Sequence, residues 1–327
     1  MATVLIATGG TIASRPGPGG SVVSQLTGRE LPDRHPEIER EGDVEVVEVA
    51  HTSSWNLDAA TMATVAERAR EAVVGGSGVV VTHGTDTIEQ TAWLTDLLAG
   101  DDTVAAPIVF TCSMRHADES GTDGPRNLRA AFRVADSPAA RGWGALVCAN
   151  GELHAARRVT KTDTTSTATF QSPGSGPVGW ITDAEPVLLG PQPTRPARGD
   201  GIVTEVGLVA AYPDLDPGVV AWHIERGAKG LVIEGTGAGN LPGPIAEAAS
   251  TAVAEGVAVV VASRCPTGTT STTYGGPGGG ATLAEAGVIA AGDLSGPKAR
   301  LALMVALGVE PSVDGARRWF ADLAEGR

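Results

Sequence analysis

The chain has few of the groups that bind nucleic acids, metals or lipid surfaces. Its 327 residues carry a formal net charge of −14, which argues against a general nucleic-acid or membrane-surface role, because both need a basic face. Its three cysteines, Cys112, Cys148 and Cys265, lie far apart and form no CxxC or Cys/His ligand spacing. They do not suggest a zinc site, and we expect no metal and no other cofactor.

Long apolar runs are also absent from the sequence. No stretch of about 18 apolar residues occurs, so no transmembrane helix is predicted. The N-terminus is already strand-like and shows no basic n-region followed by a cleavage-like segment. We therefore expect a cytoplasmic protein.

The sequence does contain a regular alternation of short strands and helices. Runs rich in β-branched residues predict strands at residues 4–7, 44–49, 78–82, 107–111 and 145–148. Helical patterns predict helices after Asp58, over 88–98 and over 125–135. Such alternation is typical of a parallel sheet with crossover helices.

The alternation breaks at LLGPQPTRPARGDG, residues 188–201, where prolines and charges follow no period. It resumes near residue 206 and continues through the C-terminal part. We therefore predict an α/β fold of two domains. The larger, over residues 1–187, has a mainly parallel sheet with flanking helices. A linker over 188–204 leads to a smaller parallel α/β domain over 205–327.

Two predicted strands end in glycine turns that are rich in hydroxyl groups, in VLIATGGTIA at 4–13 and VVVTHGTDT at 79–87. Ligands bind at the carboxyl ends of parallel strands, so Thr11, Thr85 and Asp86 are candidates to converge on one site. Each turn also has a structural interpretation, in which the threonines cap the following helix and His83 is not a base. The occurrence of both motifs at equivalent strand ends favours the functional interpretation.

A third polar segment, VTKTDTTSTATF at 159–170, contains Lys161. A lysine acts as a base only when desolvation or a neighbour helps it to lose its proton. A Thr–Lys–Asp arrangement would supply a nucleophile or its relay, a base and an orienting group. The alternative is an ordinary solvated lysine. The sequence has no P-loop, no GxGxxG fingerprint and no GxSxG elbow.

These motifs carry a resemblance to a known family. TGGTIA at 8–13, THGTDT at 82–87 and VTKTDTT at 159–165 resemble the bacterial-type L-asparaginases. Three further segments are similar to that family over nearly the whole chain, namely DGPRNL at 123–128, EGTGAGN at 234–240 and SRCPTGTT at 263–270. The resemblance implies an amidohydrolase that converts L-asparagine to L-aspartate and ammonia.

The resemblance also implies roles for individual residues. Thr11 would attack the side-chain amide, while Thr85, Lys161 and Asp86 would form a second, relay triad. Asp86 would in addition bind the α-ammonium group of the substrate. Ser54, in HTSSWNLD, matches the serine that holds the substrate α-carboxylate.

Other matches concern the edges of the site and the assembly. Trp55 takes a position where a polar residue is common in the family, and Ser113, in CSMR, would offer its backbone near the side-chain amide. The family forms homotetramers built from close dimers. Asn240 matches a residue that completes the site of the neighbouring subunit.

The chain departs from the family at two places. Residues 14–40 contain no tyrosine, although the flexible lid of the family often carries one. No acid follows SRCPTGTT until Glu285, although the partner subunit often supplies a glutamate there. We predict that Tyr274, in the glycine-rich segment TYGGPGGG, partly replaces the lid tyrosine from across a dimer interface; a surface aromatic is the alternative. A broader glutaminase-asparaginase, an amidase subunit acting on aminoacyl-tRNA and a non-catalytic amino-acid binding protein also stay open.

Overall fold

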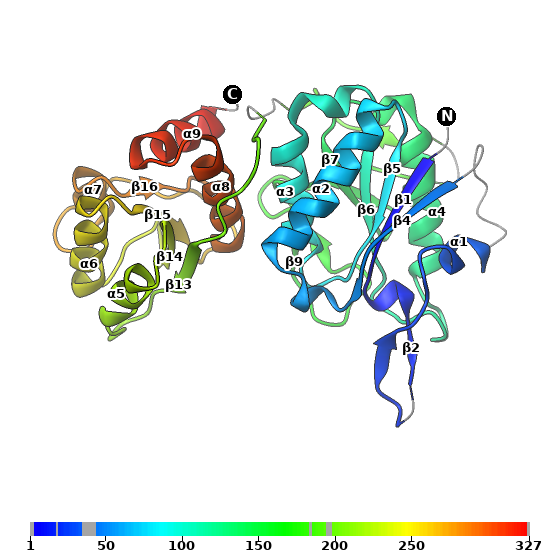
Figure 1. Ribbon diagram of the computed structural model, residues 1–327, viewed down its shortest axis with the longest axis horizontal. Coiled ribbons are helices and arrows are strands. Elements are labelled where there is room, and N and C mark those ends of the chain that lie inside the picture. The colour runs from blue at the N-terminus through cyan, green and yellow to red at the C-terminus, as the bar shows by residue number, and fades with distance from the viewer. Residues whose placement is uncertain (1–2, 18, 35–43, 183–184, 194–197, 326–327) are drawn as a thin grey trace. The chain divides into compact units, whose positions relative to one another are not determined.

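The computed structural model describes residues 3–17, 19–34, 44–182, 185–193 and 198–325. Its internal contacts divide the chain into two compact units, Met1–Arg198 and Gly199–Arg327 (Figure 1). This division falls inside the predicted linker, of which residues 194–197 lie outside the described residues. The first residue of that linker, Leu188, instead pairs in a strand. The boundaries of the domains stay a prediction, while the α/β fold of two units is confirmed.

The first unit is built on a sheet that has eight strands in the described part of the chain. In spatial order they are β12 (Val187–Leu188), β11 (Gly179–Trp180), β8 (Glu152–Ala155), β7 (Ala145–Ala149), β6 (Ile108–Thr111), β5 (Val79–Thr82), β1 (Thr3–Gly9) and β4 (Val44–Thr52). The strands from β4 to β7 are parallel, as predicted. The other three extend the sheet in antiparallel fashion.

Helices cover both faces of this sheet. Figure 1 shows α2 (Ala59–Val74) and α3 (Ile88–Ala99) on one side and α4 (Gly124–Asp136) on the other. Asp58 caps α2 as predicted, because its carboxylate accepts a 2.8 Å hydrogen bond from the backbone N–H of Thr61. Shorter helical segments are α1 (Glu30–Asp33) and the 3-10 turns η1 (Thr11–Ala13), η2 (Ser54–Asn56), η3 (Gly100–Val104) and η4 (Pro138–Ala140).

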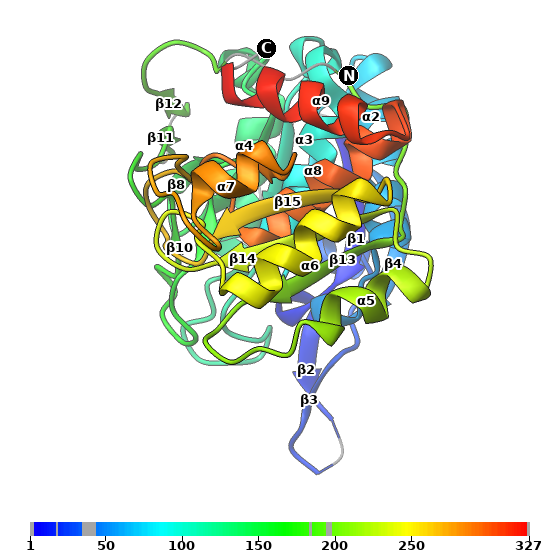
Figure 2. The same ribbon diagram turned by 90° about the vertical axis from the view of Figure 1, so that its left-hand side faces the viewer.

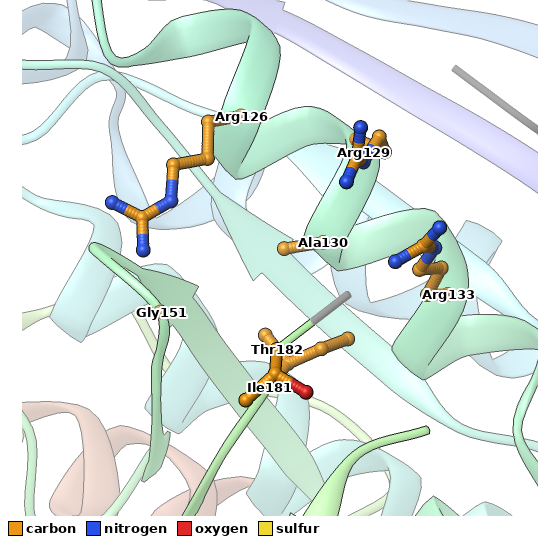
Figure 3. A pocket seen from close by; sticks show the side chains of 7 residues that line it. All are labelled: Arg126, Arg129, Ala130, Arg133, Gly151, Ile181 and Thr182. Atoms are coloured by element: carbon orange, nitrogen blue, oxygen red, sulfur yellow. The ribbon is translucent and has the colours of Figure 1, made fainter. Parts of the chain in front are cut away.

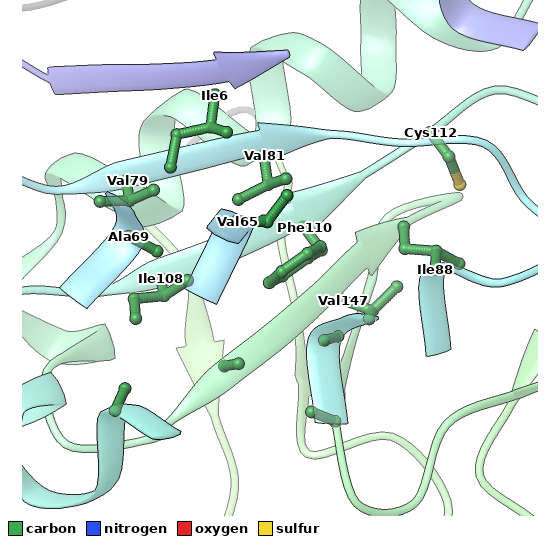
Figure 4. Close-up of a cluster of buried hydrophobic side chains, with 14 of the residues drawn as sticks. Ile6, Val65, Ala69, Val79, Val81, Ile88, Ile108, Phe110, Cys112 and Val147 are labelled. Carbon is green, nitrogen blue, oxygen red and sulfur yellow. The ribbon is translucent and has the colours of Figure 1, made fainter. Parts of the chain in front are cut away.

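The core explains why these sequences form strands. Both faces of the central strands are buried, so the strands read as continuous apolar runs rather than alternating ones. Ile6, Val81 and Phe110 point to the face covered by α2 and α3, where they meet Val65 and Ile88 (Figure 4). Their sequence neighbours point the opposite way into a second cluster against α4. The period of two along each strand thus places every second residue in each core.

Two short pairs of strands lie outside the large sheet. A hairpin of β2 (Ser14–Pro16) and β3 (Val22–Ser24) follows η1 directly. The strands β9 (Thr160–Lys161) and β10 (Phe170–Gln171) form an antiparallel pair. Val159 and Phe170 anchor this second pair in the core, where both are buried.

The second unit is a four-stranded parallel sheet in its described residues. Its strands are β13 (Val206–Ala210), β14 (Gly230–Gly235), β15 (Ala258–Ser263) and β16 (Ile289–Ala290). Its helices are α5 (Gly218–Glu225), α6 (Gly243–Ala254), α7 (Gly280–Glu285), α8 (Gly296–Val309) and α9 (Val313–Glu325). Figure 2 shows α5 and α6 in front of this sheet and α8 behind it, which matches the predicted smaller parallel domain.

Candidate active site

The loops after four neighbouring strands, β4, β1, β5 and β6, surround a pocket of about 300 Å³. Because these strands are parallel, their carboxyl ends meet at one edge of the sheet, where α/β proteins bind ligands. The pocket is lined by Gly10, Thr11, Ser14, Val22, Ser53, Ser54, Trp55, Gly84, Thr85, Asp86, Met114, His116 and Glu119. The structure therefore brings together Thr11, Thr85 and Asp86 from the two glycine turns, as the sequence predicts.

The glycines of the two turns allow these loops to touch. Gly10 has a φ of 81°, and a Cβ atom placed on it would lie 2.4 Å from Cα of Gly84. A Cβ atom on Gly84 would in turn lie 2.7 Å from Cβ of Ser54. Distances below 3.0 Å are not tolerated between such atoms, so each side chain would push two loops apart. Glycine at both positions thus keeps Thr11, Thr85 and Ser54 around one small pocket.

Neither Thr11 nor Thr85 serves as a helix cap. Gly10 precedes the turn η1, which has no side-chain cap, and Thr87 is the residue before α3. The hydroxyl of Thr87 donates to the carbonyl oxygen of Ser54 at 2.8 Å and so connects the loop after β5 to the loop after β4. The capping interpretation therefore does not account for Thr11 or Thr85.

Lys161 reaches the pocket edge from β9. Its Nζ atom donates hydrogen bonds to Oγ1 of Thr85 at 2.9 Å and to Oδ1 of Asp86 at 2.7 Å. The side chain of Lys161 is 18% exposed and that of Asp86 is 44% exposed. An ordinary solvated lysine does not fit this geometry. The amine instead touches a buried hydroxyl on one side and an accessible carboxylate on the other.

His83 lies within the second glycine turn, and its side chain has a structural role. Its Nδ1 lies 2.8 Å from the carbonyl oxygen of Gly84 and its Nε2 lies 2.8 Å from the hydroxyl of Thr91. A carbonyl only accepts, so Nδ1 carries the proton and Nε2 accepts from Thr91. Complete burial lowers the pKa of His83 to about 4. His83 is therefore neutral and fully hydrogen-bonded, in agreement with its structural interpretation.

The loop after β6 is organised by Asp123. This carboxylate accepts hydrogen bonds from the hydroxyl of Ser113 at 2.7 Å, from the backbone N–H of Met114 at 3.0 Å and from that of Arg115 at 3.0 Å. Asn127 donates to the carbonyl oxygen of Cys112 at 3.0 Å and fixes the start of the same loop. Ser113 itself is buried and turned toward Asp123, while the next residue, Met114, lines the pocket.

Two of the remaining predicted site residues lie at the pocket, and the other two lie in the second unit. Ser54 is buried at the pocket wall, and Trp55 lines the pocket mouth with 69% of its surface exposed. Asn240 and Tyr274 belong to the second unit and are described only within it. The Oδ1 atom of Asn240 is buried and has no hydrogen-bond partner among the described residues. Tyr274 is 60% exposed, and its carbonyl oxygen accepts a hydrogen bond from Ala281.

Sequence reasoning missed several residues that line the pocket, among them three from the loop after β6, Met114, His116 and Glu119. His116 Nε2 lies 3.8 Å from Oε2 of Glu119, and the same carboxylate lies 3.6 Å from Nε of Arg115. A usable signal was present, because β6, whose loop borders the pocket, ends immediately before CSMRH at residues 112–116. The path of the loop, however, depends on contacts with Asp123 that no local pattern reveals.

A second pocket of about 300 Å³ lies against the outer face of α4 (Figure 3). Arg126, Arg129 and Arg133 line it from one face of the helix, opposite Gly151 and the segment at residues 181–182. The spacing of these arginines is that of the solvent side of an amphipathic helix, whose other face is buried. None of the predicted site residues lines this pocket.

Two features are absent from the described residues. They contain no group of three or more His, Cys, Asp or Glu side chains arranged to hold a metal ion. No helix within them is both long and apolar enough to cross a membrane.

Comparison with known proteins identifies the family. A family model for the N-terminal domain of asparaginases matches residues 3–193, and a model for the glutaminase/asparaginase C-terminal domain matches residues 205–320. The chain belongs to the asparaginase family. The predicted resemblance is thereby confirmed, as is the prediction that the chain is an enzyme of this family.

Individual relatives cover most of the chain. A probable L-asparaginase from Deinococcus radiodurans is 39% identical, over 97% of this chain and 96% of the relative. L-asparaginase 2 from Bacillus subtilis is 32% identical, over 93% of this chain and 81% of its own length. A subunit of the glutamyl-tRNA(Gln) amidotransferase from Pyrococcus abyssi is 30% identical, over 96% of this chain and 74% of the relative. The chain thus resembles these relatives over most of its length, although the relatives themselves include both L-asparaginases and an amidotransferase subunit.

Proposed function

We propose that this protein hydrolyses the side-chain amide of L-asparagine, giving L-aspartate and ammonia, with Thr11 as the nucleophile. The observation that carries the proposal is the contact of Lys161 with both Thr85 and Asp86 at a pocket that Thr11 also lines. An amidohydrolase needs a nucleophile and a route for its proton, and this pocket offers both.

The pocket also suits the two charges of an α-amino acid. Oδ1 of Asp86 accepts from Lys161, yet 44% of the side chain is exposed, so the carboxylate has room to bind the substrate α-ammonium by a charge-assisted hydrogen bond. Ser54 offers a hydroxyl at the wall for the α-carboxylate. Trp55 beside it supplies apolar surface at the mouth. Ser113, which is buried and directly precedes Met114 in the chain, contributes through the backbone of its loop.

The reaction proceeds in two steps, formation of an aspartyl ester and its hydrolysis. The Oγ1 atom of Thr11 attacks the side-chain amide carbon, so that a C–O bond forms, the C–N bond breaks and ammonia leaves. The hydroxyl proton travels to the leaving nitrogen by way of Thr85 and Lys161. Water then attacks the aspartyl ester, which releases aspartate and returns a proton to Thr11. Thr85 is suited to the relay because its hydroxyl contacts the amine of Lys161 directly.

We further propose that the working form is a homotetramer, a dimer of close dimers, in which a partner subunit completes each pocket. Asn240 matches the family residue that completes the site of the neighbouring subunit, and its Oδ1 atom has no hydrogen-bond partner among the described residues. Tyr274, with 60% of its surface exposed, is available for a contact in trans. Light scattering of the purified protein, combined with activity measured on dilution, tests this assembly. The cytoplasmic location stays a prediction that fractionation of the source cells tests.

Ammonia release by purified protein tests the activity. The protein is incubated with L-asparagine and, separately, with L-glutamine, and ammonia is measured by a coupled assay. Turnover of asparagine supports the proposal, and comparable turnover of glutamine indicates a broader glutaminase-asparaginase. Calorimetric binding of asparagine without ammonia release would instead indicate a non-catalytic binding protein on this fold.

A further inference from the structure

Lys161 is held by a part of the fold that is separate from the large sheet. It belongs to β9, which pairs only with the two residues of β10 in the described structure. The burial of Val159 and Phe170 attaches this pair to the core. These apolar contacts fix the strand pair as a whole, but they do not determine the direction of an individual backbone group at Lys161, since hydrophobic contacts are not directional.

The backbone N–H of Lys161 points away from β10. In an antiparallel pair successive N–H groups point to opposite sides. The N–H of Thr162 faces the neighbouring strand and donates to the carbonyl oxygen of Thr169 at 2.8 Å. The N–H of Lys161 therefore faces outward, where it donates to Oε2 of Glu89 at 2.6 Å. Glu89 thus supplies the acceptor that the short sheet does not.

Glu89 stands three residues after Asp86, in the first turn of α3. The segment from Thr85 to Glu89 therefore holds Lys161 at both ends. Thr85 and Asp86 accept from Nζ at the tip of the side chain, and Glu89 accepts from the backbone nitrogen at its root. Lys161 thus donates three hydrogen bonds to acceptors within one segment of five consecutive residues. Together they define where the amine lies relative to the hydroxyl of Thr85.

We propose that Glu89 is a positioning residue, which sets the amine of Lys161 against Thr85 by accepting the backbone N–H of Lys161. The inference rests on the proposed function, because the amine is taken as part of the proton relay. Glu89 lies outside the set of residues that line the pocket, so it acts through Lys161 and not on the substrate.

Three variants separate an acceptor from a charge. Glu89→Gln removes the charge but keeps an oxygen acceptor on a side chain of the same length. Glu89→Asp keeps the charge but shortens the side chain by one methylene, and Glu89→Ala removes the group. We expect Glu89→Gln to keep a kcat close to that of the wild type. Glu89→Asp and Glu89→Ala are expected to lower kcat by ~10- to 100-fold, the scale of a misplaced catalytic group.

The matched control is Gln90→Ala, a truncation at the next position of the same helical turn, which is expected to leave kcat and KM unchanged. KM for asparagine should stay within ~3-fold in all Glu89 variants, because Asp86 and Ser54 are untouched. A structural role alone would lower the melting temperature without a selective loss of kcat. Equal losses of kcat in Glu89→Gln and Glu89→Ala, or wild-type kcat in Glu89→Asp and Glu89→Ala, would overturn the proposal.

A second measurement does not depend on turnover. The chain contains only three lysines, Lys161, Lys229 and Lys298, so acylation of each by an amine-reactive reagent can be followed by mass spectrometry. Lys229 is more accessible than the buried Lys298 and serves as the internal reference. We expect the ratio of Lys161 to Lys229 labelling to rise in Glu89→Ala and Glu89→Asp but not in Glu89→Gln.

The two measurements distinguish the two proposals. If the wild type releases no ammonia from asparagine, the proposed function fails, while the labelling ratios still test the position of Lys161. If the wild type is active and the labelling ratio is the same in all variants, the role of Glu89 fails and the proposed function stands.

Discussion

The Nζ atom of Lys161 lies 2.7 Å from Oδ1 of Asp86, although 75 positions separate the two residues in sequence. Lys161 comes from a short strand pair and Asp86 from the turn after β5. Because 44% of the Asp86 side chain is exposed, the pair contributes little to stability. The main effect of the contact is therefore to position the amine of Lys161, rather than to stabilise the fold.

Replacement of Lys161 by methionine should separate activity from stability. Lys161→Met keeps much of the length and the apolar part of the side chain but removes the amine. We expect kcat to fall by at least ~100-fold, the lower end of what a general base contributes, with a melting temperature close to that of the wild type. Steady-state kinetics and thermal unfolding on one preparation check both. A stable variant with near-normal kcat would remove Lys161 from the relay.

Gly10→Ala tests whether the close approach of the loops matters. Gly10 has a φ of 81°, and a Cβ atom there would lie 2.4 Å from Cα of Gly84. We expect a loss of at least ~2 kcal/mol in the free energy of unfolding, because a strained backbone conformation adds to the overlap, and a large loss of activity.

Gly19→Ala is the matched control for that variant. Gly19 has a φ of 91°, but a Cβ atom on it has no neighbour within 4 Å. Gly19→Ala introduces the strain of a positive φ without the atomic overlap. It should therefore lower the free energy of unfolding by less than Gly10→Ala does, and it should leave kcat unchanged. Urea denaturation of both variants provides the comparison, and equal costs would mean that the contact with Gly84 is not what excludes a side chain at Gly10.

Much of this arrangement could be predicted from sequence because it depends on local patterns. The apolar runs of the central strands and the face of α2 follow from periodicity, and the two glycine turns follow from their composition. The antiparallel strands β11 and β12 could not be predicted, because two residues carry no period. The contact between Glu89 and the backbone of Lys161 was equally inaccessible, since a carboxylate in a helical first turn is by itself an ordinary helix-start feature.

In the site, too, some features follow from local sequence patterns and others depend on tertiary contacts. Thr11, Thr85 and Asp86 could be predicted to share an edge, because parallel strands end at one edge of a sheet. The pocket contribution of His116 and Glu119 depends on how Asp123 folds the loop after β6. Contacts of that kind are tertiary, and the sequence of the loop does not specify them.

The buried His83 should make the protein sensitive to mild acid. Burial lowers the pKa of His83 from 6.5 to about 4, so the unfolded chain binds a proton between these values and the folded chain does not. The free energy of unfolding is therefore unaffected by the titration of His83 above pH ~6.5. It decreases as the pH falls from 6.5 toward 4, by up to about 3 kcal/mol from this residue. NMR of the imidazole nitrogens should show a neutral ring with the proton on Nδ1 at pH ~5.5, between the two pKa values. A titration midpoint near 6.5, the ordinary value, would contradict this.

In the proposed reaction the hydroxyl of Thr11 performs the attack, and a comparison of the wild type with Thr11→Val isolates that hydroxyl. Valine keeps the shape of threonine and removes only the hydroxyl, so binding contacts from Ser54 and Asp86 remain. Ammonia release from L-asparagine is measured for both proteins, and L-aspartate binding is followed by calorimetry. We expect Thr11→Val to bind aspartate within ~3-fold of the wild type and to turn over asparagine at least ~1,000-fold more slowly. A Thr11→Val protein that releases ammonia at the wild-type rate would contradict the proposed attack by Thr11.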